Sequence, residues 1–243
     1  MLTRPFLSAL AAALLLAACG ERQPSTAQPK RDAPAAARPA VDWARTAVLT
    51  PDGGVRIGNP EARARLVEFA SFTCSHCGSF HREAAGPLKA RVRDGSASWE
   101  FRPFLLNIFD LAAALLARCD GPENFFRWTE QLYADQDKWV EPLARLSEKD
   151  LAPIARLPAD RQVLEVARLA GLEEFARRRG MPAARFAACM SNQAEIDRLT
   201  RMQQAAAERF QISGTPTFVL NGRKLEGITT WPALAPRLAE AAR

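Results

Sequence analysis

The stretch Leu66-Val67-Glu68-Phe69-Ala70, followed closely by Cys74-Ser75-His76-Cys77, decides the fold of this chain. The apolar run is typical of a central strand, and the two cysteines are spaced to share the first turn of a helix. A helix N-terminus carries partial positive charge and unpaired N–H groups, which favour a thiolate over a thiol. The thiolate is the species that reacts in disulfide exchange, so the pattern predicts a reactive dithiol.

Two other uses of a CxxC pair are open at this point. Half of a zinc site usually needs a second CxxC or a nearby pair of histidines, whereas Cys119 and Cys189 are distant and isolated. Haem attachment needs a histidine directly after the second cysteine, and this chain has Gly78 there. The strand–CxxC–helix order therefore favours a redox pair over a metal or haem site.

A second signal lies far downstream, in Gly214-Thr215-Pro216-Thr217-Phe218. Pro216 precedes a β-rich run, where the missing N–H of proline is tolerated at the first position of a strand. Asn221-Gly222 then predicts a tight hairpin turn. Taken alone, Thr215-Pro216 is equally compatible with an ordinary turn.

Together these motifs resemble the DsbA-type thiol–disulfide oxidoreductases of the thioredoxin superfamily, which place a cis-proline opposite the CxxC. The resemblance implies that Pro216 lies beside Cys74 and that the backbone of Thr215 contacts an extended substrate segment. A cis X–Pro bond is rare and normally retained for a structural reason. One departure is Ser75, where the best-known members carry proline. That position tunes the redox potential, so the strength of this protein as an oxidant stays open.

The resemblance also implies the fold class, which is α/β. We expect a thioredoxin-like core over residues 46–243, with an inserted helical domain at about residues 107–211, between the CxxC helix and the cis-proline. The intervening sequence has helical periodicity, and Asp110 is a candidate N-cap for the first inserted helix. No cofactor and no metal ion are expected.

Individual residues at the site have the following expected roles. Cys74 is the exchange-reactive sulfur, because it comes first and lies nearest the helix N-terminus, and Cys77 is its resolving partner. His76 is either an exposed loop histidine or, as the family implies, a group that stabilises the Cys74 thiolate. Glu68 interrupts an apolar strand, so it is either a proton relay beneath Cys77, as the family implies, or half of a core ion pair. His81, four residues after Cys77, either packs on the helix surface, which we expect, or takes part in the chemistry.

The N-terminus predicts export. Residues 1–18 have the length of a signal peptide, with one positive charge at Arg4 followed by an apolar stretch from Leu7 to Ala18, and Leu16-Ala17-Ala18-Cys19 resembles a bacterial lipobox. Acylation of Cys19 would make residues 19–45, rich in Ala, Pro and polar residues, a lipid-anchored tether. The alternative is an ordinary cleaved signal with an incidental cysteine.

The cysteine count fits this interpretation. Five cysteines are an odd number for an exported protein, and lipid on Cys19 leaves four. Apart from the CxxC pair, Cys119 and Cys189 remain. They are either two buried thiols or, as in some DsbA-like proteins, an extra disulfide in the helical domain, and an oxidising compartment favours the bond.

The net charge of +6 comes from dispersed arginines, and basic residues are not grouped with aromatic ones as in a nucleic-acid site.

From the motifs, the resemblance and the N-terminus, we expect a monomeric periplasmic lipoprotein that introduces disulfides into exported proteins with free cysteines. The family implies a DsbB-like, quinone-linked membrane protein as its reoxidant. Two alternatives are a disulfide isomerase or reductase, and a non-catalytic binding lipoprotein with a structural CxxC. Residues 21–45 are too short and polar for the N-terminal dimerisation domain that isomerases of this superfamily usually have.

Overall fold

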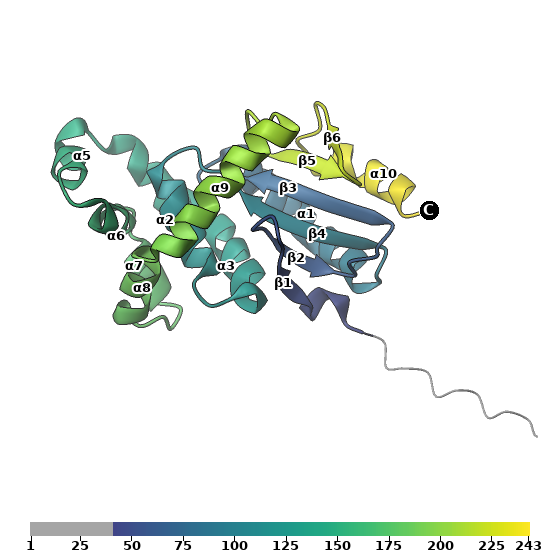
Figure 1. Cartoon of the computed structure of the whole chain (residues 1–243), viewed down its shortest axis with the longest axis horizontal. Helices are drawn as coiled ribbons and strands as arrows, with labels where there is room; N and C mark the ends of the chain where they lie inside the picture. Colours follow the sequence, from purple (N-terminus) through teal and green to yellow (C-terminus); the bar gives the residue numbers. More distant parts are fainter. Residues whose placement is uncertain (1–40) are drawn as a thin grey trace, which may run out of the picture. The chain divides into compact units, whose positions relative to one another are not determined.

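The computed structural model describes residues 41–243, in which the strands form one six-stranded mixed sheet (Figure 1). Its strand order is β1-β2-β4-β3-β5-β6. The strands are β1 (Ala47–Leu49), β2 (Val55–Gly58), β3 (Ala64–Ala70), β4 (Ala97–Pro103), β5 (Thr217–Leu220) and β6 (Arg223–Leu225). Only β3 and β4 run parallel, and the other neighbours in this sheet are antiparallel. The strand predicted around residues 66–70 is thus one of the two central strands.

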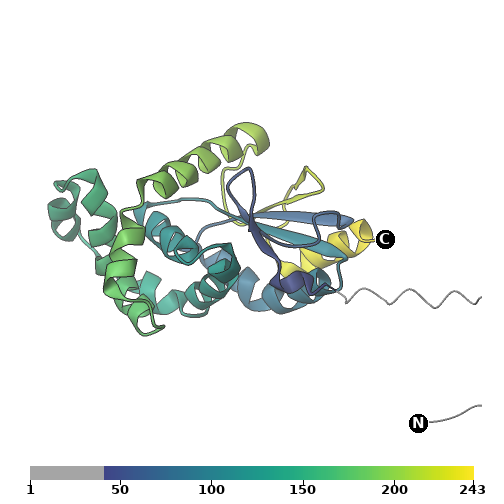
Figure 2. The ribbon, with the colours of Figure 1, turned by 60° about the horizontal axis from the view of Figure 1, so that its bottom comes forward.

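Helices cover both faces of this sheet. Helix α1 (Ser75–Arg93) packs against β4 and α10 (Trp231–Ala241) against β3, while α9 (Gln193–Phe210) crosses the opposite side of the sheet (Figure 2). Successive side chains of β3 therefore enter different cores. Glu68 faces α1, whereas Phe69 packs in a second cluster with Ala206 of α9.

Strand β4 is buried along its whole length, including its polar residues. Trp99, Phe101 and Pro103 alternate with polar residues along β4, but Glu100 and Arg102 do not reach solvent and are each 8% exposed. Arg102 Nε donates to Glu100 at 2.6 Å. Because buried charges need partners, this ion pair lets a central strand carry polar residues on its second face.

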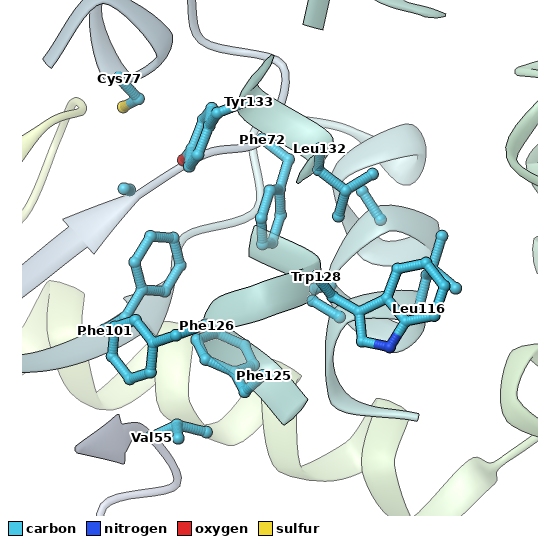
Figure 3. Close-up of a cluster of buried hydrophobic side chains, with 14 of the residues drawn as sticks. Val55, Phe72, Cys77, Phe101, Leu116, Phe125, Phe126, Trp128, Leu132 and Tyr133 are labelled. Atoms are coloured by element: carbon cyan, nitrogen blue, oxygen red, sulfur yellow. The ribbon is translucent and has the colours of Figure 1, made fainter. Parts of the chain in front are cut away.

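The chain between β4 and β5 forms the inserted helical domain that the sequence predicts (Figure 1). It consists of α2 (Ile108–Arg118), α3 (Pro122–Ala134), α4 (Gln136–Val140), the 3-10 helix η2 (Glu141–Arg145), α5 (Glu148–Ala155), α6 (Ala159–Leu169), α7 (Leu172–Arg177), α8 (Ala183–Met190) and α9. Aromatic side chains of α3 reach from the insertion to the sheet, where the rings of Phe125 and Phe101 lie 5.4 Å apart (Figure 3). The insertion and the core therefore share one hydrophobic cluster.

The prediction that Asp110 caps the first inserted helix is wrong. Helix α2 begins at Ile108, and its N-cap is Asn107, whose side chain accepts from the backbone N–H of Asp110 at 3.0 Å. Asp110 lies in the first turn and is fully buried. Its carboxylate serves the loop before the CxxC, as described below.

Cys119 at the end of α2 and Cys189 in α8 form a disulfide in this structure, with Cα atoms 5.6 Å apart. This separation is ordinary for a disulfide. The bond joins the first helix of the insertion to its penultimate one.

The expected signal peptide (1–18), Cys19 and most of the tether (19–45) lie outside the described residues. Trp43–Arg45 form a short 3-10 helix, η1, that packs against α1 and β2. Among residues 41–243, no helix has the length and apolar character needed to span a membrane.

Candidate active site

The CxxC pair lies where β3 passes into α1. Cys74 is the N-cap of α1 and is partly exposed, whereas Cys77, in the first turn, is fully buried. Both sulfurs are free thiols in this structure. The loop from β3 thus presents one sulfur to solvent and holds the other beneath it.

The segment before β5 completes the site. The Thr215–Pro216 bond is cis, and the Cys74 thiol donates a hydrogen bond to the backbone carbonyl of Thr215 at 3.3 Å. The two motifs that are far apart in the sequence therefore meet, as the resemblance implied. Antiparallel pairing of β5 with β3 brings them together, since Thr217 lies opposite Phe69, near the end of β3 that leads to the CxxC.

The surroundings of Cys74 lower its pKa from an ordinary 9.0 to about 5. The largest cause is a hydrogen bond from the Cys77 thiol, followed by one from the Thr215 side chain and then by the backbone N–H groups of Cys77 and His76, while partial burial opposes the shift. The Thr215 hydroxyl is buried and has no hydrogen-bond partner among the described residues, so it is free to donate to the ionised sulfur. These donors stabilise the negative sulfur at the helix N-terminus.

Cys77 shows the opposite behaviour. Burial raises its pKa far above the ordinary value, and the hydrogen bond to Cys74 together with the negative charge of that sulfur raises it further. The pair is therefore polarised, because Cys74 ionises first and Cys77 keeps its proton. This asymmetry supports the assignment of Cys74 as the reactive sulfur and Cys77 as its partner.

The side chain of His76 is exposed. Its contribution to the pKa of Cys74 comes through its backbone N–H, which any residue except proline would supply at this position. A specific role for the imidazole of His76 stays a prediction.

Glu68 lies at the centre of a buried hydrogen-bonded group. Its carboxylate accepts from Trp99 Nε1 at 2.9 Å, and Oε1 lies 3.0 Å from His81 Nε2. The prediction that His81 packs on the helix surface is wrong, since it is 4% exposed and stacks on Tyr133 at 4.2 Å between ring centroids. The physical reason is spacing: His81 follows Cys77 by four residues, so both lie on the buried face of α1. A relay role for Glu68 stays a proposal.

Asp110 was missed as a site residue in the sequence. Its carboxylate accepts from the Ser71 hydroxyl at 2.9 Å and from the backbone N–H groups of Thr73 and Leu106 at 2.8 Å. Ser71 Oγ in turn accepts from the backbone N–H of Cys74 at 3.1 Å. Burial raises the pKa of Asp110, and these donors oppose that rise. The first helix of the insertion therefore fixes the loop that carries Cys74.

Tyr133 and Gln136 were missed as well. The Tyr133 hydroxyl donates to the carbonyl of Ser71 at 3.0 Å, and Gln136 Nε2 donates to the carbonyls of Phe72 at 2.8 Å and Cys74 at 2.9 Å. Figure 3 shows Tyr133 and Phe72 on the Cys77 side of the hydrophobic cluster. Side chains from α3 and α4 thus satisfy backbone carbonyls of a buried loop, which would otherwise be costly.

In the described part of the chain, no three His, Cys, Asp or Glu side chains are grouped as metal ligands would be.

Comparison with known proteins places this geometry in a family. The model of a family described as thioredoxin matches residues 50–237. Two curated relatives, from Rickettsia prowazekii and Rickettsia conorii, are named as candidate protein-disulfide oxidoreductases and are 26% and 27% identical over 177 and 186 residues. These alignments cover 72% and 76% of this chain but only 57% and 59% of the relatives, so the chain spans less than two thirds of their length.

Solved structures agree with this result. A protein-disulfide isomerase from Novosphingobium aromaticivorans superposes with a TM-score of 0.73 at 31% identity, over 77% of this chain and 96% of that one. Wolbachia pipientis alpha-DsbA1 superposes with a TM-score of 0.63 at 21% identity, over 80% of this chain and 94% of that one. The chain belongs to the thioredoxin family, and its helical insertion gives it the fold of the DsbA type.

Proposed function

We propose that this protein is a thiol–disulfide oxidoreductase that introduces disulfides into exported proteins through Cys74 and Cys77. The observation that carries this proposal is the polarised pair: the pKa of Cys74 is lowered to about 5 while that of the buried Cys77 is raised. A stabilised Cys74 thiolate favours the reduced enzyme over its disulfide. The disulfide is therefore readily reduced, which is the property of an oxidant.

The reaction proceeds by two exchanges. A substrate thiolate attacks the Cys74 sulfur of the enzyme disulfide, the bond to Cys77 breaks, and Cys77 leaves as a thiolate that takes up a proton. A second substrate thiolate then attacks the substrate sulfur of the mixed disulfide and releases the Cys74 thiolate. The substrate loses two electrons to form its disulfide, and the enzyme gains them as the reduced pair.

Thr215 is proposed to align the substrate. It precedes β5 and lies outside that strand's ladder, so its backbone groups remain free of sheet pairing. Its carbonyl is already in contact with the Cys74 sulfur. An extended peptide that pairs with this backbone would place its cysteine against Cys74, and Pro216 would hold the backbone in place.

The decisive test uses reduced, unfolded ribonuclease A mixed with the oxidised protein. We expect disulfides to appear in the substrate as the enzyme becomes reduced. Cys74→Ser should abolish transfer, whereas Cys77→Ala should accumulate a mixed disulfide at Cys74 with added oxidised glutathione. Failure of the oxidised wild type to transfer disulfides would refute the proposal and favour a non-catalytic protein with a structural CxxC.

A second candidate, disulfide isomerase, is favoured by one observation: the Novosphingobium structure is named as an isomerase. Substrate with scrambled disulfides distinguishes the two activities. An isomerase would restore native pairing when supplied as the reduced form, whereas an oxidase would act on thiols only.

The cellular setting is proposed from the N-terminal sequence. Lipid on Cys19 would anchor the protein at a membrane facing the periplasm, and a DsbB-like quinone-linked protein would reoxidise it. Stable anchoring takes more than one acyl chain, so mass analysis of the mature N-terminus should find several. A Cys19→Ala variant should lose membrane association yet keep Cys74 chemistry. An unmodified N-terminus downstream of Cys19 in protein from its host would exclude lipidation.

A further inference from the structure

His81 uses only one of its two ring nitrogens. Nε2 faces Glu68 Oε1 at 3.0 Å, whereas Nδ1 is buried and has no hydrogen-bond partner among the described residues. A buried unpaired nitrogen costs free energy. Stacking on Tyr133 accounts for an aromatic ring here, and pairing with Glu68 accounts for Nε2, but neither contact involves Nδ1.

The same ring lines a pocket between α1 and α3. This pocket has a volume of about 210 Å³, and Arg82, Ala85, Glu130 and Tyr133 form much of its wall. The volume is enough for several water molecules, but the exposed wall is almost wholly apolar, so the pocket admits water from bulk solvent without binding it tightly. Arg82 is exposed, so the pocket reaches solvent at the surface of the molecule. His81 thus lies between solvent on one side and the buried carboxylate on the other.

We propose that His81 is a proton-relay residue that connects solvent in this pocket with Glu68, and through Glu68 with Cys77. The proposal rests on the function proposed above and extends it, since exchange at Cys74 requires Cys77 to gain and lose a proton. Cys77 and His81 lie one turn apart on the buried face of α1. Burial is the largest cause of the raised pKa of Tyr133, and the charges of Cys77 and Glu68 raise it further, so both groups lie near the ring that stacks on His81.

The proton balance of the oxidising half-reaction follows from this arrangement. When substrate attacks Cys74, Cys77 leaves as a buried thiolate and receives a proton by way of Glu68. The Glu68 carboxylate takes the Nε2 proton of His81 and passes it to Cys77, while Nδ1 takes a proton from water in the pocket. One proton enters, and His81 changes from the Nε2–H to the Nδ1–H tautomer without turning its ring. Because Nδ1 is covered, this step needs the pocket wall to admit a water briefly.

Reoxidation runs the same path in reverse. Cys77 must lose its proton to attack Cys74 or a mixed disulfide, and the proton passes to Glu68 and then to Nε2 of His81. The Nδ1 proton leaves to solvent, which restores the first tautomer. Each catalytic cycle therefore resets His81, and no net proton stays in the core.

The groups around His81 suit a relay rather than a fixed ion pair. From β4, Trp99 donates to the other carboxylate oxygen of Glu68 and is itself neutral. From α3, Tyr133 keeps its proton because burial raises its pKa, and Glu130 forms an ion pair with Lys89. Arg82 of α1 is the remaining charged side chain at the pocket. Among the described residues, Glu68 is the one carboxylate that hydrogen-bonds to a ring nitrogen of His81.

The test measures reduction of the Cys74–Cys77 disulfide by glutathione in stopped flow. His81→Ala should slow the reduction about a hundredfold, the lower range for a positioned proton donor. Added imidazole should restore part of the rate, because it can enter the enlarged pocket. Ala85→Leu, which fills the pocket without touching the relay, should slow reduction and, combined with His81→Ala, should block the rescue.

Two further variants separate chemistry from structure. His81→Gln can still donate to Glu68 but has no second ring nitrogen, so it should be slow while its thermal unfolding stays near that of the wild type. Glu83→Gln, an exposed change on the same helix, should leave the rate unchanged. Wild-type rates in His81→Gln, or slow His81→Ala without imidazole rescue, would overturn the relay. A wild type that glutathione does not reduce would instead overturn the proposed function.

Discussion

Replacing Cys77 with alanine or with serine tests the electrostatics of the site most directly. The largest cause of the low pKa of Cys74 is the hydrogen bond from the Cys77 thiol. Cys77→Ala removes this donor, whereas Cys77→Ser supplies a hydroxyl in its place. Both variants leave Cys74 as the only free thiol of the CxxC, so its titration can be followed without interference.

The expected change in the pKa of Cys74 follows from the hydrogen bond that Cys77→Ala removes. A hydrogen bond to a charged group is worth about 1.5–3 kcal/mol, and one pKa unit corresponds to about 1.4 kcal/mol. Because Cys74 is partly exposed, solvent weakens this hydrogen bond, and its free energy lies at the lower end of that range. We therefore expect Cys77→Ala to raise the pKa of Cys74 from about 5 by about one unit, and Cys77→Ser to change it little. The Thr215 side chain and the backbone N–H groups keep the remaining shift in both variants.

Alkylation by iodoacetamide as a function of pH measures this pKa. At pH near 5.5, a one-unit rise lowers the thiolate fraction of Cys74 about threefold, after each rate is normalised to its plateau at high pH. Equal midpoints for the alanine and serine variants would refute the role of the Cys77 thiol. A midpoint at about 8.5 in the wild type would refute the low-pKa thiolate altogether.

The same shift makes stability depend on pH in the reduced protein. Folding lowers the pKa of Cys74 from 9.0 to about 5, so its ionisation adds stability that is complete above pH 9.0 and lost as the pH falls to about 5. About four units would correspond to about 5 kcal/mol, and partial exposure reduces this to about 2–3 kcal/mol. Denaturant unfolding should show that the free energy of unfolding of the reduced protein rises with pH across this range, relative to that of the oxidised protein. A constant difference would contradict the assignment.

Three further predictions concern the insertion and its contacts. Replacing both Cys119 and Cys189 with alanine opens a loop with a sequence separation of 70 and should cost about 4 kcal/mol in the entropic model, measured by denaturant unfolding; an unchanged midpoint would contradict this. Asp110→Ala leaves several buried donors without an acceptor and should lower the free energy of unfolding by about 3–5 kcal/mol, and Asp110→Asn should lower it less. A loss below about 1 kcal/mol for Asp110→Ala would show that this hydrogen-bonded network does not stabilise the fold. Gly78→Ala would place a Cβ against Gln136 Oε1, so Gly78→Ala and Gln136→Ala should each slow disulfide exchange. The double variant should be no slower than the slower of the two single variants, because both changes disturb the same contact. Rate losses that add in the double variant would show that the two residues act independently.

The parts of the fold that the sequence predicts are those with local causes. The strand over residues 66–70, the helix after Cys74 and the strand after Pro216 are each marked by neighbouring residues, and the family resemblance supplies their arrangement. The burial of His81 has a local cause as well. Its spacing of four from the buried Cys77 already places it on the buried face, so its burial was readable from periodicity.

Other site residues have no local cause. Asp110 in an apolar helix signals a buried carboxylate, but nothing near it in the chain identifies Ser71 and Thr73 as its partners. Gln136 is a common surface residue type, and only the fold shows that it is 3% exposed and bonded to the carbonyl of Cys74. Such contacts join segments tens of residues apart, and single-sequence patterns carry no information on that pairing.

These contacts give the inserted domain a role at the site. Asp110 holds the N–H side of the loop before α1, while Tyr133 and Gln136 hold its carbonyl side, so both edges of that loop are fixed by the insertion. The pKa of Cys74 depends on donors whose positions this loop sets. A thioredoxin-like core alone would leave those backbone groups to water, and the loop would sample more conformations. The insertion therefore contributes to the reactivity of Cys74 by holding its backbone, even though none of the three side chains hydrogen-bonds to the sulfur.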